Sequence, residues 1–226
     1  MITFSAMKTV PPLVVAISAM TLLPAKAAIV PGTADLWLAG MPDRSTASGD
    51  SAPAQSPPLA GSVTPGQSYS FTVSGWVNYV PASSGPPPDG DFLCVHAAGA
   101  ENGIATLTAP VSSLIGVFLG PSQPNLTSAP AGLDFGAIGL DFTSLSPALQ
   151  QPFFIGDGRT SGGVTQQFIA PAGSTRLFLG SVDGTGWNNN SGQFDVVITG
   201  VPEPSTYLAG LGALGMLGVF GWRNRK

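Results

Sequence analysis

Short runs of alternating apolar and polar residues constrain the fold of this chain more than any other feature. A helix repeats its apolar residues every three to four positions, whereas a half-buried strand alternates them every two. Period-two or short apolar runs recur along the chain, and clusters of glycine, proline or asparagine separate them. They lie at residues 69–76, 92–95, 113–119, 163–169, 175–182 and 193–199. The pattern predicts an all-β chain folded as an antiparallel β-sandwich.

The segment before these runs has a different character. Residues 28–61 are predicted to hold an N-terminal strand, at 33–38, and a surface loop rich in serine, alanine and proline. Residues 62–200 are predicted to form the β-sandwich itself. The pattern also favours one short helical turn at 146–151.

Charge and cysteine content exclude several classes of protein. Residues 28–200 carry eleven acidic side chains, three arginines and no lysine, which gives a net charge of about −8. Nucleic-acid binding is excluded, because neutralising phosphates requires clustered lysine and arginine. One cysteine, Cys94, and one histidine, His96, exclude a disulfide framework and a zinc site of four such ligands. An acidic surface does suit hard cations such as Ca²⁺.

No catalytic motif is present in the sequence. Neither a Gly-x-Ser-x-Gly turn nor a His-Glu-x-x-His helix occurs. Cys94 and His96 are predicted to be packed strand residues, although their spacing places them on one face and leaves a Cys/His dyad open. The chain is therefore predicted not to be an enzyme, and a hydrolase that uses surface carboxylates is the least favoured alternative.

The N-terminus has the pattern of a secretory signal. Lys8 precedes an uncharged stretch at 10–23, and Ala25 and Ala27 put small residues where a signal peptidase reads. We therefore predict a signal helix within residues 1–27 that is cleaved after Ala27. The alternative is an N-terminal membrane anchor that is not cleaved.

The C-terminus predicts a membrane-spanning helix. Residues 205–222 carry no charge, and Arg223, Asn224, Arg225 and Lys226 follow them. Eighteen helical residues extend roughly 27 Å, close to the thickness of a bilayer core. The basic end is expected to stay on the cytoplasmic side, which puts the preceding residues outside the membrane.

Pro202, Glu203 and Pro204 stand immediately before this apolar segment. A Pro-Glu-Pro tripeptide, an apolar helix and a short arginine-rich end together resemble the PEP-CTERM sorting signal of Gram-negative bacteria, here over residues 201–226. The resemblance implies that an exosortase recognises the tripeptide. It also implies export, transient anchoring in the membrane through the helix, and then transfer to the cell surface or an extracellular polysaccharide matrix. A stop-transfer anchor that is never processed is the alternative.

The segment 183–192 is the strongest candidate for binding chemistry. A strand is predicted to end at Asp183, a loop of glycine and asparagine follows, and the next strand begins near Gln193. Such a loop gathers carboxylate, amide and carbonyl oxygens, which are the ligands of Ca²⁺. The alternative is a hairpin whose asparagines only supply turn conformations.

This loop resembles the calcium loop of the PA-IL-type galactose-binding lectins, which are small secreted β-sandwiches of jelly-roll-like architecture. The resemblance extends over residues 62–200 and includes the segments 65–79, 113–116 and 153–156. It implies a calcium ion held by five residues, with side-chain oxygens from three and carbonyl oxygens from two. They are Asp183, Asn189 and Asn190 for the side chains, and Tyr79 and Gly186 for the carbonyls.

The same resemblance implies a sugar site at the calcium ion. Asp183 and Asn189 are expected to bind sugar hydroxyls, and Asp89 lies in the region where the lectins carry their specificity residues. Trp187 is expected either to stack on a sugar ring or to anchor the loop. Two departures are visible, since the spacing from Asp183 to Asn189 is one residue shorter than in the lectins and their specificity histidine and glutamine have no counterpart.

These features together predict an exported, exosortase-processed β-sandwich that binds carbohydrate with the help of Ca²⁺ and associates with extracellular polysaccharide. The alternative is a structural matrix or surface protein with the same fold and no sugar binding.

Overall fold

A computed structural model describes residues 25–53 and 57–201. Residues 1–24 of the predicted signal segment, the C-terminal membrane helix and the Pro202–Pro204 tripeptide lie outside the described residues. Ala25 and Ala27 of the predicted cleavage site are described, and Ala27 belongs to the first strand, Lys26–Pro31. Among those that the structure describes, no helix has the length and apolar character needed to cross a bilayer.

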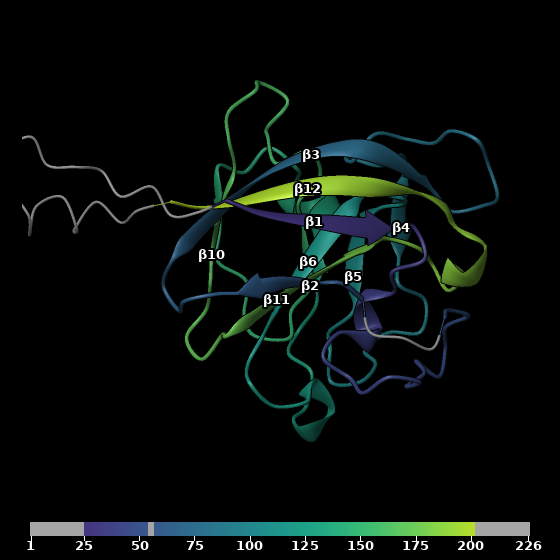
Figure 1. Ribbon diagram of the computed structural model, residues 1–226, viewed down its shortest axis with the longest axis horizontal. Coiled ribbons are helices and arrows are strands. Elements are labelled where there is room, and N and C mark those ends of the chain that lie inside the picture. The colour runs from purple at the N-terminus through teal and green to yellow at the C-terminus, as the bar shows by residue number, and fades with distance from the viewer. Residues whose placement is uncertain (1–24, 54–56, 202–226) are drawn as a thin grey trace, which may run out of the picture. The chain divides into compact units, whose positions relative to one another are not determined.

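The described chain forms three sheets (Figure 1). The first has the order β1 (Lys26–Pro31), β12 (Ser191–Val201), β3 (Ser68–Asn78), β10 (Gln167–Ile169) and β8 (Ser144–Leu145). The second has the order β2 (Leu59–Ser62), β11 (Arg176–Ser181), β6 (Leu114–Leu119) and β9 (Phe153–Phe154). The third has the order β4 (Leu93–Val95), β5 (Leu107–Pro110) and β7 (Leu133–Asp134). Seven pairings are antiparallel, whereas β8–β10 and β5–β7 are parallel, so the sheets are mixed rather than purely antiparallel.

The all-β prediction is confirmed, and each of the six predicted runs contains a strand. The strand expected at 33–38 is wrong, because Leu36–Leu38 forms the 3-10 helix η1 and the first strand is β1. The Asp35 carboxylate caps η1 by accepting a hydrogen bond from the Trp37 amide at 2.9 Å. Three consecutive buried apolar residues fit such a tight turn, which points side chains in several directions.

The helical turn expected at 146–151 is also wrong, because this segment has no helix. The helices lie instead at η2 (Pro124–Leu126), α1 (Phe135–Ile138) and η3 (Trp187–Asn189). The Asp134 carboxylate caps α1 by accepting from the Gly136 amide at 2.9 Å. A local cap therefore decides where this short helix begins.

The first two sheets pack face to face around one apolar core. Along β12, Phe194, Val196 and Ile198 are buried and alternate with more exposed residues, so this strand turns one face inward. The six residues of β6 are all buried, as expected for a strand covered on both faces. Aromatic rings join the layers, with Tyr69 of β3 and Phe118 of β6 6.4 Å apart between centroids.

Strands from both ends of the described chain close these layers. β1 pairs along β12 from Lys26↔Ile198 to Pro31↔Gln193, and β2 pairs with β11. Residues 28–61 thus contribute a strand to each layer. Because β11 and β12 belong to different layers, the segment that joins them crosses from one sheet to the other, and this segment is the candidate calcium loop.

Candidate metal centre

The loop of residues 182–190 is anchored by the buried side chain of Trp187. The indole has no exposed area, and its Nε1 donates to the Ser181 carbonyl at 3.0 Å. Its ring lies 5.6 Å from that of Trp37 and 5.9 Å from that of His96. The prediction that Trp187 stacks on a sugar is therefore wrong, because no face of the ring reaches the surface, and the residue anchors the loop instead.

Asp183 turns its carboxylate into the loop. Oδ1 accepts hydrogen bonds from the amides of Thr185 and Gly186, each at 3.2 Å. Oδ2 is buried and has no hydrogen-bond partner within the described part of the chain. The residue is 8% exposed, so water does not readily substitute for the missing donor.

Gly186 leaves an open space beside this carboxylate. A Cβ atom placed on Gly186 would lie 3.8 Å from Asn189 Oδ1 and 3.8 Å from each carboxylate oxygen of Asp183. Three of the predicted ligand oxygens thus surround the position that a side chain at residue 186 would fill. The Gly186 carbonyl accepts only a long hydrogen bond, at 3.4 Å, from the Asn189 amide.

Asn190 is fixed from the opposite side. Its Nδ2 donates to the Gly32 carbonyl at 3.0 Å, so Oδ1 must point the other way, and that buried atom has no partner among the described residues. The last pair of the β3–β12 ladder joins Asn78 to Ser191, so Tyr79 and Asn190 both lie just beyond the end of that ladder. The Tyr79 ring is 37% exposed and meets the Phe92 ring edge to face at 5.9 Å.

Asp89 lies at a different place. Its Oδ1 accepts from the Asp157 amide at 2.9 Å, and the residue lines an open pocket of about 400 Å³ together with Asp141 and Arg159. Burial raises the pKa of Asp89, and the Asp157 carboxylate also raises it. The structure thus groups Asp89 with other surface acids and not with the loop ligands.

Cys94 borders the loop, with its sulfur 3.7 Å from the position of a Cβ on Gly184. Burial, and then the negative charge of Asp183, raise the pKa of the Cys94 thiol. A raised pKa keeps the sulfur protonated, which is the reverse of what a nucleophile needs.

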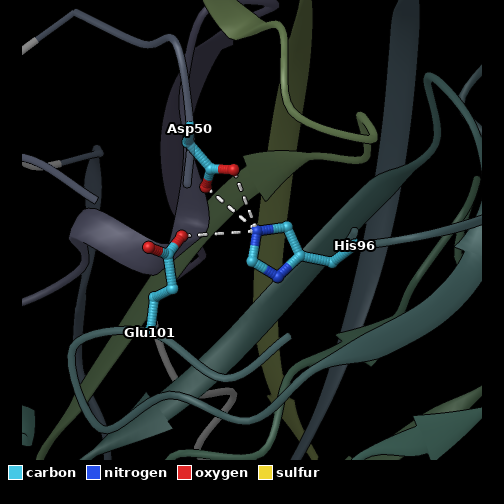
Figure 2. A group of neighbouring side chains, drawn as sticks. All are labelled: Asp50, His96 and Glu101. Carbon is cyan, nitrogen blue, oxygen red and sulfur yellow. Dashed lines mark hydrogen bonds and ion pairs between the residues drawn. The ribbon is translucent and has the colours of Figure 1, made fainter. Parts of the chain in front are cut away.

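A second group of ionisable side chains lies behind the loop, and no sequence motif predicted it. Figure 2 shows Asp50 and Glu101 directed at the ring of His96. His96 is buried and stacks on Trp37 at 3.5 Å between ring centroids, in keeping with the packed role predicted for it. Asp50 lies in the serine-rich loop and Glu101 in a turn, so no local motif joins the three.

Comparisons with known proteins bear mainly on the C-terminus. The PEP-CTERM protein-sorting motif matches residues 200–226. The chain carries a PEP-CTERM sorting signal. This confirms the prediction from the Pro-Glu-Pro tripeptide, and the signal marks an exosortase-processed protein that is exported to the cell surface or beyond.

Two further comparisons add little. No curated protein matches the sequence. Among solved structures, the chain is similar to one described as an EclA N-terminal domain and PllA-like lectin, with 11% identity and a TM-score of 0.34. This match covers 80% of the present chain and 98% of the other. A score this low carries no argument about function.

Proposed function

We propose that the exported module binds carbohydrate with the help of Ca²⁺ at the loop between β11 and β12, and that it associates with extracellular polysaccharide. The proposal includes the jelly-roll-like fold of galactose-binding lectins, a mature module of residues 28–200 and no catalytic activity. It also includes the signal helix cleaved after Ala27, which would leave Ala28–Pro31 of β1 to pair with β12.

Two unsatisfied oxygens carry the calcium part of the proposal. Asp183 Oδ2 and Asn190 Oδ1 are buried without a donor among the residues described, and both are oxygen ligands of the kind that Ca²⁺ takes. Burying such atoms unpaired costs about 1–3 kcal/mol each, which a cation would offset. The open space beside Gly186 supports the same assignment.

The residues that would hold the ion are those implied by the lectin resemblance. Asp183, Asn189 and Asn190 would contribute side-chain oxygens, and Tyr79 and Gly186 would contribute carbonyls. When bound, the ion would supply a hard positive charge to which sugar hydroxyls can coordinate. Because only Asp183 is charged, we expect a weak site, with Kd on the order of 0.1–1 mM as in other extracellular modules.

Exposed groups beside the loop support the sugar part. Asn189 reaches the surface and can bind hydroxyls together with Asp183. Phe92 is 54% exposed and contacts the ring of Tyr79, so this pair offers an exposed apolar face just beyond the end of β3. Sugar rings commonly lie on aromatic faces of this kind, because their C–H groups are apolar. We therefore assign to Tyr79 and Phe92 the stacking role that the sequence suggested for Trp187.

Calorimetric titration tests both parts. The full chain in detergent micelles, dialysed against a chelator, is titrated first with Ca²⁺ and then with a panel of soluble glycans. We expect a heat of Ca²⁺ binding in the parent protein and none in Asp183→Asn. We expect a heat of glycan binding only when Ca²⁺ is present. Asp195→Asn is the matched control, because Asp195 is an exposed acid on β12. Equal calcium heat in Asp183→Asn and the parent would refute the loop as the site.

The second candidate is a structural matrix or surface protein with no sugar binding. The burial of Trp187 favours it, because the loop itself then has no aromatic ring for a sugar to stack on. A heat of Ca²⁺ binding without any heat of glycan binding would favour the structural function. Loss of glycan binding in Phe92→Ala, with calcium binding intact, would select the first.

A further inference from the structure

The group formed by Asp50, His96 and Glu101 is centred on one nitrogen atom. His96 Nε2 lies 3.0 Å and 3.2 Å from the two carboxylate oxygens of Asp50. It lies 3.7 Å from Glu101 Oε2. Figure 2 shows both carboxylates pointing at this nitrogen from different loops. The three side chains are between 0% and 8% exposed, so the group is enclosed.

The hydrogen bond of the other ring nitrogen determines the tautomer of His96. Nδ1 lies 2.6 Å from the Gly99 carbonyl, which can only accept a hydrogen bond, so Nδ1 must carry a proton. In a neutral ring Nε2 then turns its lone pair toward two carboxylates. That arrangement is repulsive unless Nε2 holds a proton or binds a cation. Metal-ligating histidines typically donate their second nitrogen to a carbonyl in this way.

The two carboxylate oxygens of Glu101 differ in their hydrogen bonding. Its Oε1 accepts from Ser48 Oγ at 3.0 Å and from the Gly49 amide at 2.7 Å, which hold the carboxylate in place. Its Oε2, directed toward His96, is buried and has no hydrogen-bond partner in the described chain. A carboxylate held by one oxygen and unsatisfied at the other is positioned for a further ligand.

The charge around this nitrogen is unbalanced. Two carboxylates, those of Asp50 and Glu101, face the single nitrogen His96 Nε2. Enclosed negative charge of this kind is costly unless a cation compensates it.

We propose that Asp50, His96 and Glu101 form a structural binding site for a divalent metal ion of the zinc class. One imidazole nitrogen and one oxygen from each of two carboxylates are ligands that suit Zn²⁺, whereas Ca²⁺ takes oxygen ligands, and a water molecule would complete the four-coordinate shell. Zinc bonds of about 2.0–2.2 Å in tetrahedral geometry place the ligand atoms roughly 3.3 Å apart. The separations of 3.0, 3.2 and 3.7 Å from Nε2 bracket that value. Because the three side chains are almost entirely buried, we assign the ion a structural role.

The segments that carry this site are hydrogen-bonded to the loop between β11 and β12, where the proposed function lies. Ser51, next to Asp50, donates its amide to the Thr185 carbonyl at 2.7 Å and accepts from the Asn188 amide at 2.9 Å. Ala97, next to His96, donates its amide to the Gly184 carbonyl at 3.0 Å. A metal that joins the 50 and 96 segments would thus hold both sides against which the loop rests. The metal assignment rests on its own residues and does not require Ca²⁺ or sugar binding.

Cobalt and zinc titrations of the full chain in detergent, stripped of metal with a chelator, test the site. Tetrahedral Co²⁺ gives strong visible absorption, and we expect that band to appear at one equivalent and to vanish on adding Zn²⁺. Co²⁺ is also expected to quench the fluorescence of Trp37, which stacks on His96. Zn²⁺ is expected to raise the Tm, whereas Ca²⁺ neither displaces Co²⁺ nor removes the band.

Glu101→Gln is the decisive variant, because its amide oxygen can still accept from Ser48 and Gly49. We expect it to unfold cooperatively but to bind Zn²⁺ at least about tenfold more weakly. Asp50→Asn is expected to behave in the same way. Asp183→Asn is the matched control and should keep its zinc response, so failure of the calcium proposal leaves this result unchanged. Absence of the Co²⁺ band in the parent, or equal zinc affinity in folded Glu101→Gln, would overturn the proposal.

Discussion

At the scale of single residues, two pairs of buried oxygen atoms have no hydrogen-bond donor within the described part of the chain. One pair, Asp183 Oδ2 and Asn190 Oδ1, belongs to the loop between β11 and β12. The other, Asp35 Oδ2 and Glu101 Oε2, lies near His96. Buried polar atoms are satisfied in most native proteins, so these oxygens require an explanation, and the proposed cations would supply partners for Asp183 Oδ2, Asn190 Oδ1 and Glu101 Oε2.

Asp35 also predicts how stability varies with pH. Burial, and next the charge of Asp50, raise the pKa of Asp35 from 3.8 to about 7. The folded protein therefore keeps this proton up to about pH 7, whereas the unfolded chain releases it near pH 4. The stabilisation is complete below pH 4 and is lost as the pH rises through 7, and a shift this large is worth a few kcal/mol.

Asp35→Asn tests this linkage, because the amide oxygen can still cap η1 through the Trp37 amide. In the presence of a chelator, we expect the free energy of unfolding of the variant to depend less on pH between 4 and 8. The variant should also gain stability relative to the parent above pH 7. Urea unfolding at several pH values measures both, and identical profiles would contradict the assigned pKa.

At the scale of elements, the pairing of β3 with β12 is the longest in the described chain and depends on one glycine. Gly75 has φ of +95° and faces Phe194 across the ladder. A Cβ at residue 75 would lie 2.4 Å from the Gln193 carbonyl oxygen. Both the backbone conformation and the close approach of β12 therefore require glycine there.

Gly75→Ala is expected to lower the free energy of unfolding by about 1–3 kcal/mol or more, from strain and the steric clash together. Gly66→Ala is the matched control, since Gly66 has φ of +80° but nothing within 4 Å of an added Cβ. It should show only the cost of the backbone conformation. Equal losses in urea unfolding would show that the approach of β12 contributes nothing.

The elements also show why sequence patterns succeed in some places and fail in others. β3 and β12 could be predicted because one face of each is buried and alternation follows. The segment η1 could not, because its three residues are all buried and its conformation is set by the Asp35 cap.

The two candidate sites also differ in how far the sequence could predict them. The loop at Asp183 could be found because its oxygens are neighbours in the sequence. Asp50, His96 and Glu101 could not, because only the fold brings their segments together and Asp50 lies in a stretch of low complexity. The sequence held one signal for this group, which is that Glu101 is the single glutamate within residues 28–200.

At the scale of the whole molecule, the sorting signal decides where the protein resides. Exosortase processing predicts that the tripeptide Pro202–Pro204 is needed for release from the membrane. We expect a variant with alanine at all three positions to remain in the membrane fraction and to retain residues 205–226. Fractionation and intact-mass measurement of the two forms test this.

Cells that lack the exosortase are the control for this experiment. The parent protein in those cells should behave like the alanine variant in normal cells. Equal release of the parent, the variant and the control would show that the signal is not used. A released form that begins at Ala28 would in addition establish the predicted signal cleavage.

The last ladder pair joins Val201 to Ser68, and the next residue in the chain is Pro202. The finished sheet and the processing tripeptide therefore have no spacer between them. An exosortase that acts at this tripeptide would therefore work on residues that directly follow β12 in the sequence. We expect opening of the final β3–β12 pairs to change how readily the enzyme reaches the tripeptide.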